Sequence, residues 1–304
     1  MFGEWLAKPA QPLQGIGSSI GAWRLAALAQ ADPLAALDRF EAAYLAQSYS
    51  DKPDAHEVAA EAGRILDQFV DDQARREILA SQRIHLNVVT TLAPGLLGAH
   101  STTLQMLGLI KIIAANAVSR GLFARCLQRV LFHAPGAVVK YHDDGFRTQY
   151  QPLALENLRA ALLGTAAIPL VIAAVRDIPG GPPGTYLDGG LIDYHMDLPL
   201  AQPDGLMLLP HFSERVVPGW FDRYFKGRVP RHLDKALLLA PSAELLARLP
   251  NGKVPDRRDF AHYGKDNAAR IRDWKKAIDE CQRMADDWQR WLADGSLVGR
   301  IEPL

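Results

Sequence analysis

The pentapeptide Gly17-Ser18-Ser19-Ile20-Gly21 fits the pattern Gly-x-Ser-x-Gly, in which a serine hydroxyl acts as a nucleophile. This pattern places Ser19 on a sharp turn between a strand and a helix, where glycine on either side is expected to relieve crowding. The helix that follows directs its first N–H groups and the positive end of its dipole to the same point. We therefore expect the N–H of Ile20 to stabilise an oxyanion that forms beside Ser19.

The surroundings of the pentapeptide strengthen this interpretation. A short apolar segment at 12–16 predicts a buried strand, and 19–30 predicts a helix, which together give the strand–turn–helix setting that the pattern requires. The pattern alone is weak, because average glycine usage produces it by chance in roughly one chain in ten of this length. The competing interpretation is a glycine-rich turn that only connects a strand to a helix.

A second group of residues, Asp188-Gly189-Gly190, follows a short predicted strand at 186–187. A carboxylate at the end of a strand can serve as a general base, and two glycines after it leave room for another segment to approach closely. Taken alone, Asp-Gly-Gly is also typical of an ordinary turn.

Together the two groups resemble the patatin-like phospholipase family, in which such a serine elbow and an Asp-Gly-Gly or Asp-Gly-Ala supply a Ser–Asp dyad. The stretch Gly164-Thr165-Ala166-Ala167-Ile168-Pro169 is similar to the small-residue segment that this family carries before its aspartate, and Gly190-Leu191-Ile192-Asp193 is similar to the segment after it. The segment at 84–92 resembles the central strand of the family. The resemblance covers roughly residues 12–210.

The resemblance implies a lipid acyl hydrolase, that is, a serine carboxylic-ester hydrolase of the phospholipase or lipase type. Ser19 would attack the ester carbonyl, Asp188 would accept its proton, and water activated by Asp188 would release the acid from an acyl-enzyme. Gly17, Ile20 and Gly21 would form the elbow and its oxyanion donor, and Gly189 would lie beside the site with Gly190. Neither a metal ion nor an organic cofactor is expected.

Two other functions stay open at this stage. One is a catalytically weak or inactive patatin-like protein that binds lipids or a partner. The other is a Ser–His–Asp hydrolase, whose histidine would have to come from the candidates after Asp188, which are His195, His211, His232 and His262. The Asp-Gly-Gly context argues against the triad, because it explains the aspartate without a histidine.

One family feature is missing before Ser19. The family places a Gly-rich oxyanion loop after its first strand, upstream of the elbow, and the residues before Ser19 are not Gly-rich. A strand, a loop and a helix would need about 25–30 residues at typical lengths. We expect a chain that is truncated at its N-terminus or whose translation begins at an internal Met, with 2–7 as the tail of the missing helix. The loss of one oxyanion donor lowers the rate by about 100- to 1000-fold.

The alternation of strands and helices predicts an α/β fold of three layers, patatin-like, with a mostly parallel central sheet. Further strands are expected at 84–92, 146–151, 205–209 and 236–239, and helices at 33–49, 55–70, 102–117, 122–131 and 153–167. Charged residues surround an apolar seam whose members recur at spacings of three and four, and this pattern predicts a long amphipathic helix over 266–292. The seam residues are Ile271, Trp274, Ile278, Cys281, Ala285, Trp288 and Leu292. We expect a single domain over 1–304, with a catalytic core at 1–210 and a C-terminal helical extension at 211–304.

Composition narrows the partners and the compartment. Lys plus Arg equals Asp plus Glu at 34 each, which argues against a nucleic-acid binder driven by bulk charge. Two distant cysteines, the absence of a secretory pattern and the absence of a long apolar stretch favour a cytoplasmic protein. The expected partner is a lipid or another acyl ester, with peripheral membrane contact through the C-terminal helix as a secondary expectation. Acyl-chain preference, head-group preference and oligomeric state are left open.

Overall fold

The structure is a computed structural model that describes residues 11–201 and 205–303. The chain divides into two compact units, which are described separately. The larger unit comprises residues 12–209 and 215–237 and holds Ser19 and Asp188. The smaller unit contains 210–214 and 238 onward. The predicted helix tail at 2–7 lies outside the described residues.

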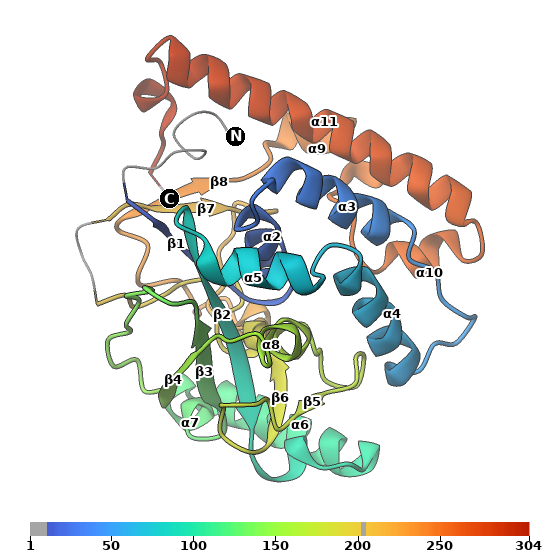
Figure 1. Cartoon of the computed structure of the whole chain (residues 1–304), viewed down its shortest axis with the longest axis vertical. Helices are drawn as coiled ribbons and strands as arrows, with labels where there is room; N and C mark the ends of the chain where they lie inside the picture. Colours follow the sequence, from blue (N-terminus) through green and yellow to red (C-terminus); the bar gives the residue numbers. More distant parts are fainter. Residues whose placement is uncertain (1–10, 202–204, 304) are drawn as a thin grey trace. The chain divides into compact units, whose positions relative to one another are not determined.

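A six-stranded sheet forms the centre of the larger unit (Figure 1). Its strands are β1 (Leu13–Gly17), β2 (Ile84–Ala93), β3 (Gln128–His133), β4 (Thr148–Pro152), β5 (Val175–Arg176) and β6 (Thr185–Asp188). The order is β4-β3-β2-β6-β5, and β1 also pairs with β2. Because β3 occupies one edge of β2 from Asn87 to Leu92, β1 and β6 share the other edge.

The prediction of a mostly parallel sheet is wrong. Only β1–β2 and β3–β4 are parallel, whereas β2–β3, β2–β6 and β5–β6 are antiparallel. The link between β2 and β3 carries helices, but Leu92 at the end of β2 pairs with Gln128 at the start of β3. The chain therefore returns to the same end of the sheet that it left, and β3 runs antiparallel to β2. The alternation of helices and strands in the sequence does not determine whether neighbouring strands are parallel. The mixed α/β class is confirmed.

Helices lie between β1 and β2, between β2 and β3, and between β4 and β5. They are α2 (Ser19–Leu28), α3 (Pro33–Leu45), α4 (Ala55–Asp67), α5 (Asp72–Ala80), α6 (Thr102–Val118), α7 (Arg120–Ala124) and α8 (Leu158–Thr165), with short 3₁₀ turns η1 (Gly95–Gly98), η2 (Gly189–Leu191) and η3 (Trp220–Tyr224). Asp32 caps α3, as its side chain accepts the N–H of Ala35 at 3.0 Å and Pro33 takes the first helical position. The predicted helix at 122–131 is wrong after α7, because its second half is β3.

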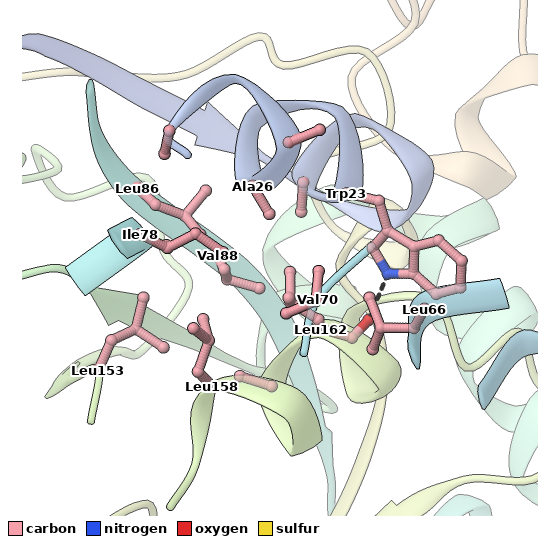
Figure 2. Close-up of a cluster of buried hydrophobic side chains, with 14 of the residues drawn as sticks. Trp23, Ala26, Leu66, Val70, Ile78, Leu86, Val88, Leu153, Leu158 and Leu162 are labelled. Atoms are coloured by element: carbon pink, nitrogen blue, oxygen red, sulfur yellow. Dashed lines mark hydrogen bonds between the residues drawn. The ribbon is translucent and has the colours of Figure 1, made fainter. Parts of the chain in front are cut away.

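Two apolar clusters lie on opposite faces of the sheet. Tyr186 joins the cluster formed with α2, α3, α4 and α8, and its neighbour Leu187 joins the cluster formed with α6 and α7. Successive side chains of a strand point to opposite faces, so helices cover both. In the first cluster, Leu86 and Val88 of β2 lie beneath α2 (Figure 2). There Trp23 donates its indole N–H to the carbonyl of Leu162 at 2.7 Å, which joins α2 to α8.

Strands β7 (Met207–Pro210) and β8 (Ala236–Leu239) form a separate two-stranded sheet, and the chain passes from one unit to the other within each of them. The smaller unit then continues as α9 (Ala243–Arg248), η4 (Pro250–Gly252), α10 (Asp259–Tyr263), α11 (Asn267–Ala293) and η5 (Val298–Arg300). The predicted C-terminal helix is confirmed, with Asp266 as its N-cap.

The buried stripe of α11 differs from the predicted seam. Its buried residues are Arg270, Trp274, Ala277 and Trp288, whereas Ile278, Cys281 and Leu292 are exposed. The ring of Trp274 packs against Phe260 of α10, and the Arg270 guanidinium lies 4.6 Å from the centre of the Phe260 ring. Among the described residues, no helix is both long and apolar enough to cross a membrane.

Candidate active site

Ser19 stands at the turn between β1 and α2, as predicted. Its backbone φ is 51°, in the left-handed region that a residue with a side chain rarely adopts, and this conformation costs about 1–3 kcal/mol. Ser18 before it is extended and buried, and Ser19 itself is half-buried. Such a strained turn holds the side chain of Ser19 out of the helix, in the manner that a nucleophilic serine requires.

The two glycines of the pentapeptide have different roles. A Cβ on Gly17 would lie 2.7 Å from the backbone nitrogen of Ala22, so only glycine lets β1 approach α2 this closely. A Cβ on Gly21 would meet nothing within 4 Å. The expectation that both glycines relieve crowding is therefore confirmed for Gly17 and wrong for Gly21, whose position in the first turn of α2 has open space around it.

Asp188 lies at the end of β6, on the same edge of β2 as the strand that leads into the elbow. Gly17 pairs with Val88 and Asp188 pairs with Thr90, on the same edge of β2. Since β1 is parallel and β6 antiparallel to β2, their last residues point toward each other. Two residue steps along a strand correspond to about 7 Å. The structure thus brings the two predicted catalytic segments together from positions far apart in the sequence.

Direct packing joins the two segments. A Cβ on Gly189 would lie 2.2 Å from the carbonyl oxygen of Val89 and 2.9 Å from the Cβ of Ser18. Glycine is thus required after Asp188 because the turn η2 packs against the centre of β2 and against the elbow. The Asp188 carboxylate is buried, and its Oδ1 accepts the N–H of Gly190 at 2.7 Å. This hydrogen bond fixes the orientation of the carboxylate.

Thr165 connects the elbow to β2. The backbone N–H of Ser19 donates to the Thr165 hydroxyl at 2.9 Å, and that hydroxyl donates to the carbonyl of Val89. The N–H of Ile20, in contrast, lies in the first turn of α2, where N–H groups have no acceptor within the helix. Thr165 thus holds the Ser19 backbone in place, and the role of the Ile20 N–H as an oxyanion donor stays a prediction.

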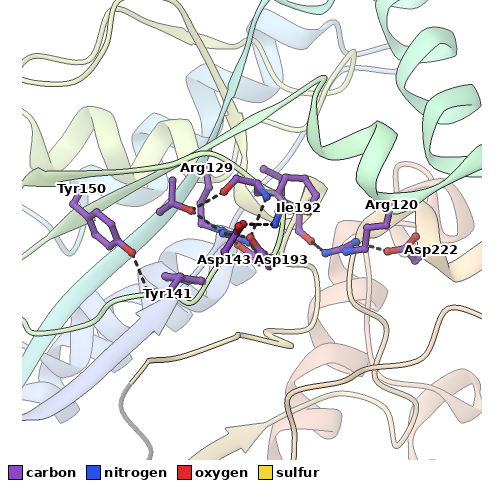
Figure 3. A network of polar contacts seen from close by, with 12 residues as sticks. Arg120, Arg129, Tyr141, Asp143, Tyr150, Ile192, Asp193 and Asp222 are labelled. Carbon is purple, nitrogen blue, oxygen red and sulfur yellow. Dashed lines mark hydrogen bonds and ion pairs between the residues drawn. The ribbon is translucent and has the colours of Figure 1, made fainter.

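A buried arginine anchors the segment that follows Asp188 (Figure 3). Arg129 on β3 makes two hydrogen bonds to Asp193, from Nε at 2.6 Å and from Nη2 at 2.9 Å, and also pairs with Asp144 at 2.7 Å. Asp193 in turn donates its backbone N–H to the carbonyl of Gly189 at 3.0 Å. The Arg129 side chain therefore fixes the end of the turn that carries Asp188.

Electrostatics keep this arginine charged. Burial disfavours the guanidinium cation, but the carboxylates of Asp193 and Asp144 outweigh burial and raise the pKa of Arg129. Burial and the neighbouring Asp193 carboxylate raise the pKa of the Tyr141 phenol, whose ring lies 4.4 Å from the guanidinium carbon. The cluster thus holds Arg129 as a permanent cation between two carboxylates.

A second arginine holds the same turn from the other side. Arg120 donates from Nη2 to the carbonyl of Ile192 at 3.0 Å and from Nη1 to Asp222 at 2.6 Å (Figure 3). Asp222 is fully buried and also accepts the side-chain N–H of Asn116 at 2.8 Å. The residues from Gly189 to Asp193 are consequently tied both to β3 and to the start of α7.

The four candidate histidines lie in different settings. His195 is buried, its Nδ1 accepts the N–H of Val217 at 2.9 Å, and its ring stacks on Tyr194. His211 belongs to the smaller unit, where burial lowers its pKa against the opposing effect of the Ser213 carbonyl. His232 donates its backbone N–H to Asp197 at 2.7 Å. His262 meets the ring of Tyr263 edge to face in α10, also in the smaller unit.

Sequence reasoning did not assign roles to Thr165, Arg129 and Asp193. Thr165 lies inside the small-residue segment already quoted, where a single hydroxyl among alanines was the available signal. Arg129 lies with Arg125 in an apolar run that was predicted to be helical, and the sequence does not show that Arg129 is the buried one of the two. Asp193 follows Asp188 by five residues and gave no separate signal.

A surface hollow of the larger unit does not border this site. The hollow between α4 and α8 is lined by Arg64, Asp67, Arg159 and neighbouring small residues, and none of the site residues borders it. Across 11–201 and 205–303, no group of three or more His, Cys, Asp or Glu side chains is placed to hold a metal ion.

Comparison with known proteins gives no relative. No family model, no curated protein and no solved structure matches the chain.

Proposed function

We propose that this chain hydrolyses carboxylic esters of lipids through a Ser19–Asp188 dyad, on a fold of the patatin-like type. The observation that carries the proposal is the meeting of β1 and β6 on one edge of β2, with Gly17 opposite Val88 and Asp188 opposite Thr90. A strained serine at one strand end and a buried, oriented carboxylate at the other are the parts that a dyad needs.

The proposed reaction proceeds in two steps. Asp188 accepts the hydroxyl proton of Ser19 as its oxygen attacks the ester carbonyl, and the N–H of Ile20 donates to the oxyanion. The alcohol leaves with the proton from Asp188, and an acyl group stays on Ser19. Asp188 then takes a proton from water, the resulting hydroxide attacks the acyl-enzyme, and the acid is released while Ser19 regains its proton.

The dyad is preferred to a triad for a structural reason. His195 is the candidate histidine nearest to Asp188 in sequence, but its Nδ1 accepts the backbone N–H of Val217. That nitrogen therefore carries no proton for a carboxylate, which a triad histidine needs there.

The test is intact-mass detection of a fluorophosphonate adduct on the purified chain. We expect one adduct on the parent and none on Ser19→Ala or Asp188→Asn. Ser18→Ala is the matched control, because it keeps the Cβ that Gly189 contacts and should still be labelled. A folded parent that forms no adduct would contradict the proposal and favour the inactive, lipid- or partner-binding alternative.

A further inference from the structure

Helix α6 exposes a wide apolar face. Six large aliphatic side chains on it have exposed fractions between 38 and 75%, namely Leu104, Met106, Leu107, Ile110, Ile113 and Val118. At about 100° per residue they cover roughly half of the helix circumference. The opposite side, with Gly108 and Ile112, packs into the protein. Contiguous apolar surface of this kind marks a site of interaction rather than ordinary protein surface.

The charge around this face has one sign. Lys111 is exposed near the edge of the apolar arc, and Arg125 is exposed just after α7. The segment 78–142, which contains α6, has no Asp or Glu, although the whole chain has 34. Neither Lys111 nor Arg125 takes part in an ion pair within the part of the chain that the structure describes. The helix that carries the apolar face therefore has one cation, Lys111, and no acid, and the segment around it in the sequence adds cations only.

A second basic segment contacts the same helix. The turn η3 touches α6, and Arg228 donates to the carbonyl of Asn116 on α6 at 2.7 Å. Residues 215–233 include five cations and a single acid, Asp222, which is buried and paired with Arg120. Two apolar side chains of this segment, Tyr224 and Val229, are also strongly exposed. The basic surface thus extends beyond α6 and includes further apolar side chains.

We propose that α6 and the adjoining 215–233 segment dock this protein on an anionic lipid surface. Apolar side chains would enter the interface, while Lys and Arg side chains contact the phosphates of the head groups. A second copy of the chain is a poor occupant, because a two-fold contact through α6 would bring Lys111 and its neighbours against the same cations. This docking would give Ser19 access to esters in a lipid layer, but binding itself needs no chemistry at Ser19.

The experiment is co-sedimentation of the full chain with vesicles of phosphatidylcholine alone or mixed with phosphatidylglycerol. We expect at least tenfold stronger binding to the anionic vesicles, weakened by added salt. Ile110→Asp should reduce binding more than tenfold, because it places a charge where an apolar side chain would be buried. Lys111→Glu should reduce binding by about fivefold or more, since each cation near an anionic surface contributes about that factor.

Two control variants separate vesicle binding by the α6 face from general surface effects and from hydrolysis at Ser19. Leu34→Asp alters an equally exposed leucine on α3 and should bind as the parent does. Ser19→Ala should also bind as the parent does, so loss of hydrolysis and loss of docking are separable. Circular dichroism verifies that each variant folds. The proposal is overturned if the parent binds neither vesicle, if Ile110→Asp binds as the parent does, or if the parent forms a dimer that Ile110→Asp dissociates.

Discussion

Gly17 and Asp188 are the last residues of two strands that meet end to end along one edge of β2, two residues apart in register. A single long strand, β2, therefore aligns both halves of the candidate site. Val88 faces the strand that leads into Ser19, Thr90 faces the strand that ends at Asp188, and the carbonyl of Val89 between them accepts the Thr165 hydroxyl. Substitutions around Val89 should therefore affect catalysis and stability together.

The two motif glycines should respond differently to alanine. Gly17→Ala is expected to lower the free energy of unfolding by about 1–3 kcal/mol, because its Cβ would collide with the backbone of α2. Gly21→Ala should leave it unchanged or raise it by about 0.5–1 kcal/mol, because alanine favours a helix and the site is open. Urea denaturation measures both, and fluorophosphonate labelling should survive only in Gly21→Ala. If both variants lost the same free energy of unfolding, Gly17 would not be packed against the backbone of α2 as the structure shows.

Thr165→Val should impair catalysis without changing substrate binding. The substitution keeps the shape but removes the oxygen that accepts the Ser19 N–H and donates to Val89. We expect kcat to fall by about 10- to 100-fold as Ser19 loses its position, with KM unchanged, because Thr165 acts through Ser19. Stability should fall by about 1–3 kcal/mol. Thr165→Ser keeps the hydroxyl and should restore most of kcat, and a Thr165→Ser variant as slow as Thr165→Val would contradict this role.

The sequence predicts best those elements whose ends are marked by neighbouring residues, such as a capping side chain or a change of composition. Asp32 with Pro33 marks the start of α3, and the strand-to-helix switch at Ser19 comes from an apolar segment followed by an alanine-rich one. Strand direction had no such signal, because it depends on which residues pair across the sheet. The helix predicted over 122–131 wrongly includes residues 128–131 of β3, because a strand buried on both faces has no period-two pattern.

The candidate site was also only partly predictable. Ser19 and Asp188 were found through glycine patterns, which report local backbone requirements. Thr165 and Arg129 act through partners distant in sequence, at Ser19 and Asp193, and only the folded chain brings these together. The sequence does not predict the exposed face of α6 for a similar reason. Its apolar composition is that of a buried helix, and exposure is a property of the packed structure.

Arg129→Met should be strongly destabilising. It leaves the buried carboxylate of Asp193 and the partly buried carboxylate of Asp144 without their cation, which costs about 3–5 kcal/mol in the free energy of unfolding. Adding Asp193→Asn to Arg129→Met should recover part of this loss, because it removes one of the uncompensated charges. Arg159→Met is the matched control. Its ion pair with Asp67 is exposed, so its loss should cost no more than about 1 kcal/mol. If urea denaturation gave equal losses of unfolding free energy for Arg129→Met and Arg159→Met, Arg129 would not anchor the turn that carries Asp188.

The smaller unit should show an acid-sensitive contribution from Asp259. Burial favours the neutral acid, but the Lys253 ammonium, the N–H of Asp256 and the indole N–H of Trp274 outweigh it and lower the Asp259 pKa below its ordinary value of 3.8. A carboxyl whose folded-state pKa is depressed stabilises the fold above its unfolded pKa. That stabilisation is lost as the pH falls from 3.8 through the folded-state pKa.

The test compares the urea denaturation of the parent with that of Asp259→Asn across this range. At neutral pH the variant should be less stable by about 1–3 kcal/mol, because Lys253 and the Trp274 indole lose a charged acceptor. Below pH 3.8 the difference should shrink, since protonated Asp259 in the parent no longer accepts these bonds as an anion. Lys253→Met should likewise destabilise the protein at neutral pH, because it leaves Asp259 without its cation. A difference between parent and Asp259→Asn that stays constant into acid would mean that the Asp259 carboxylate does not contribute through its charge.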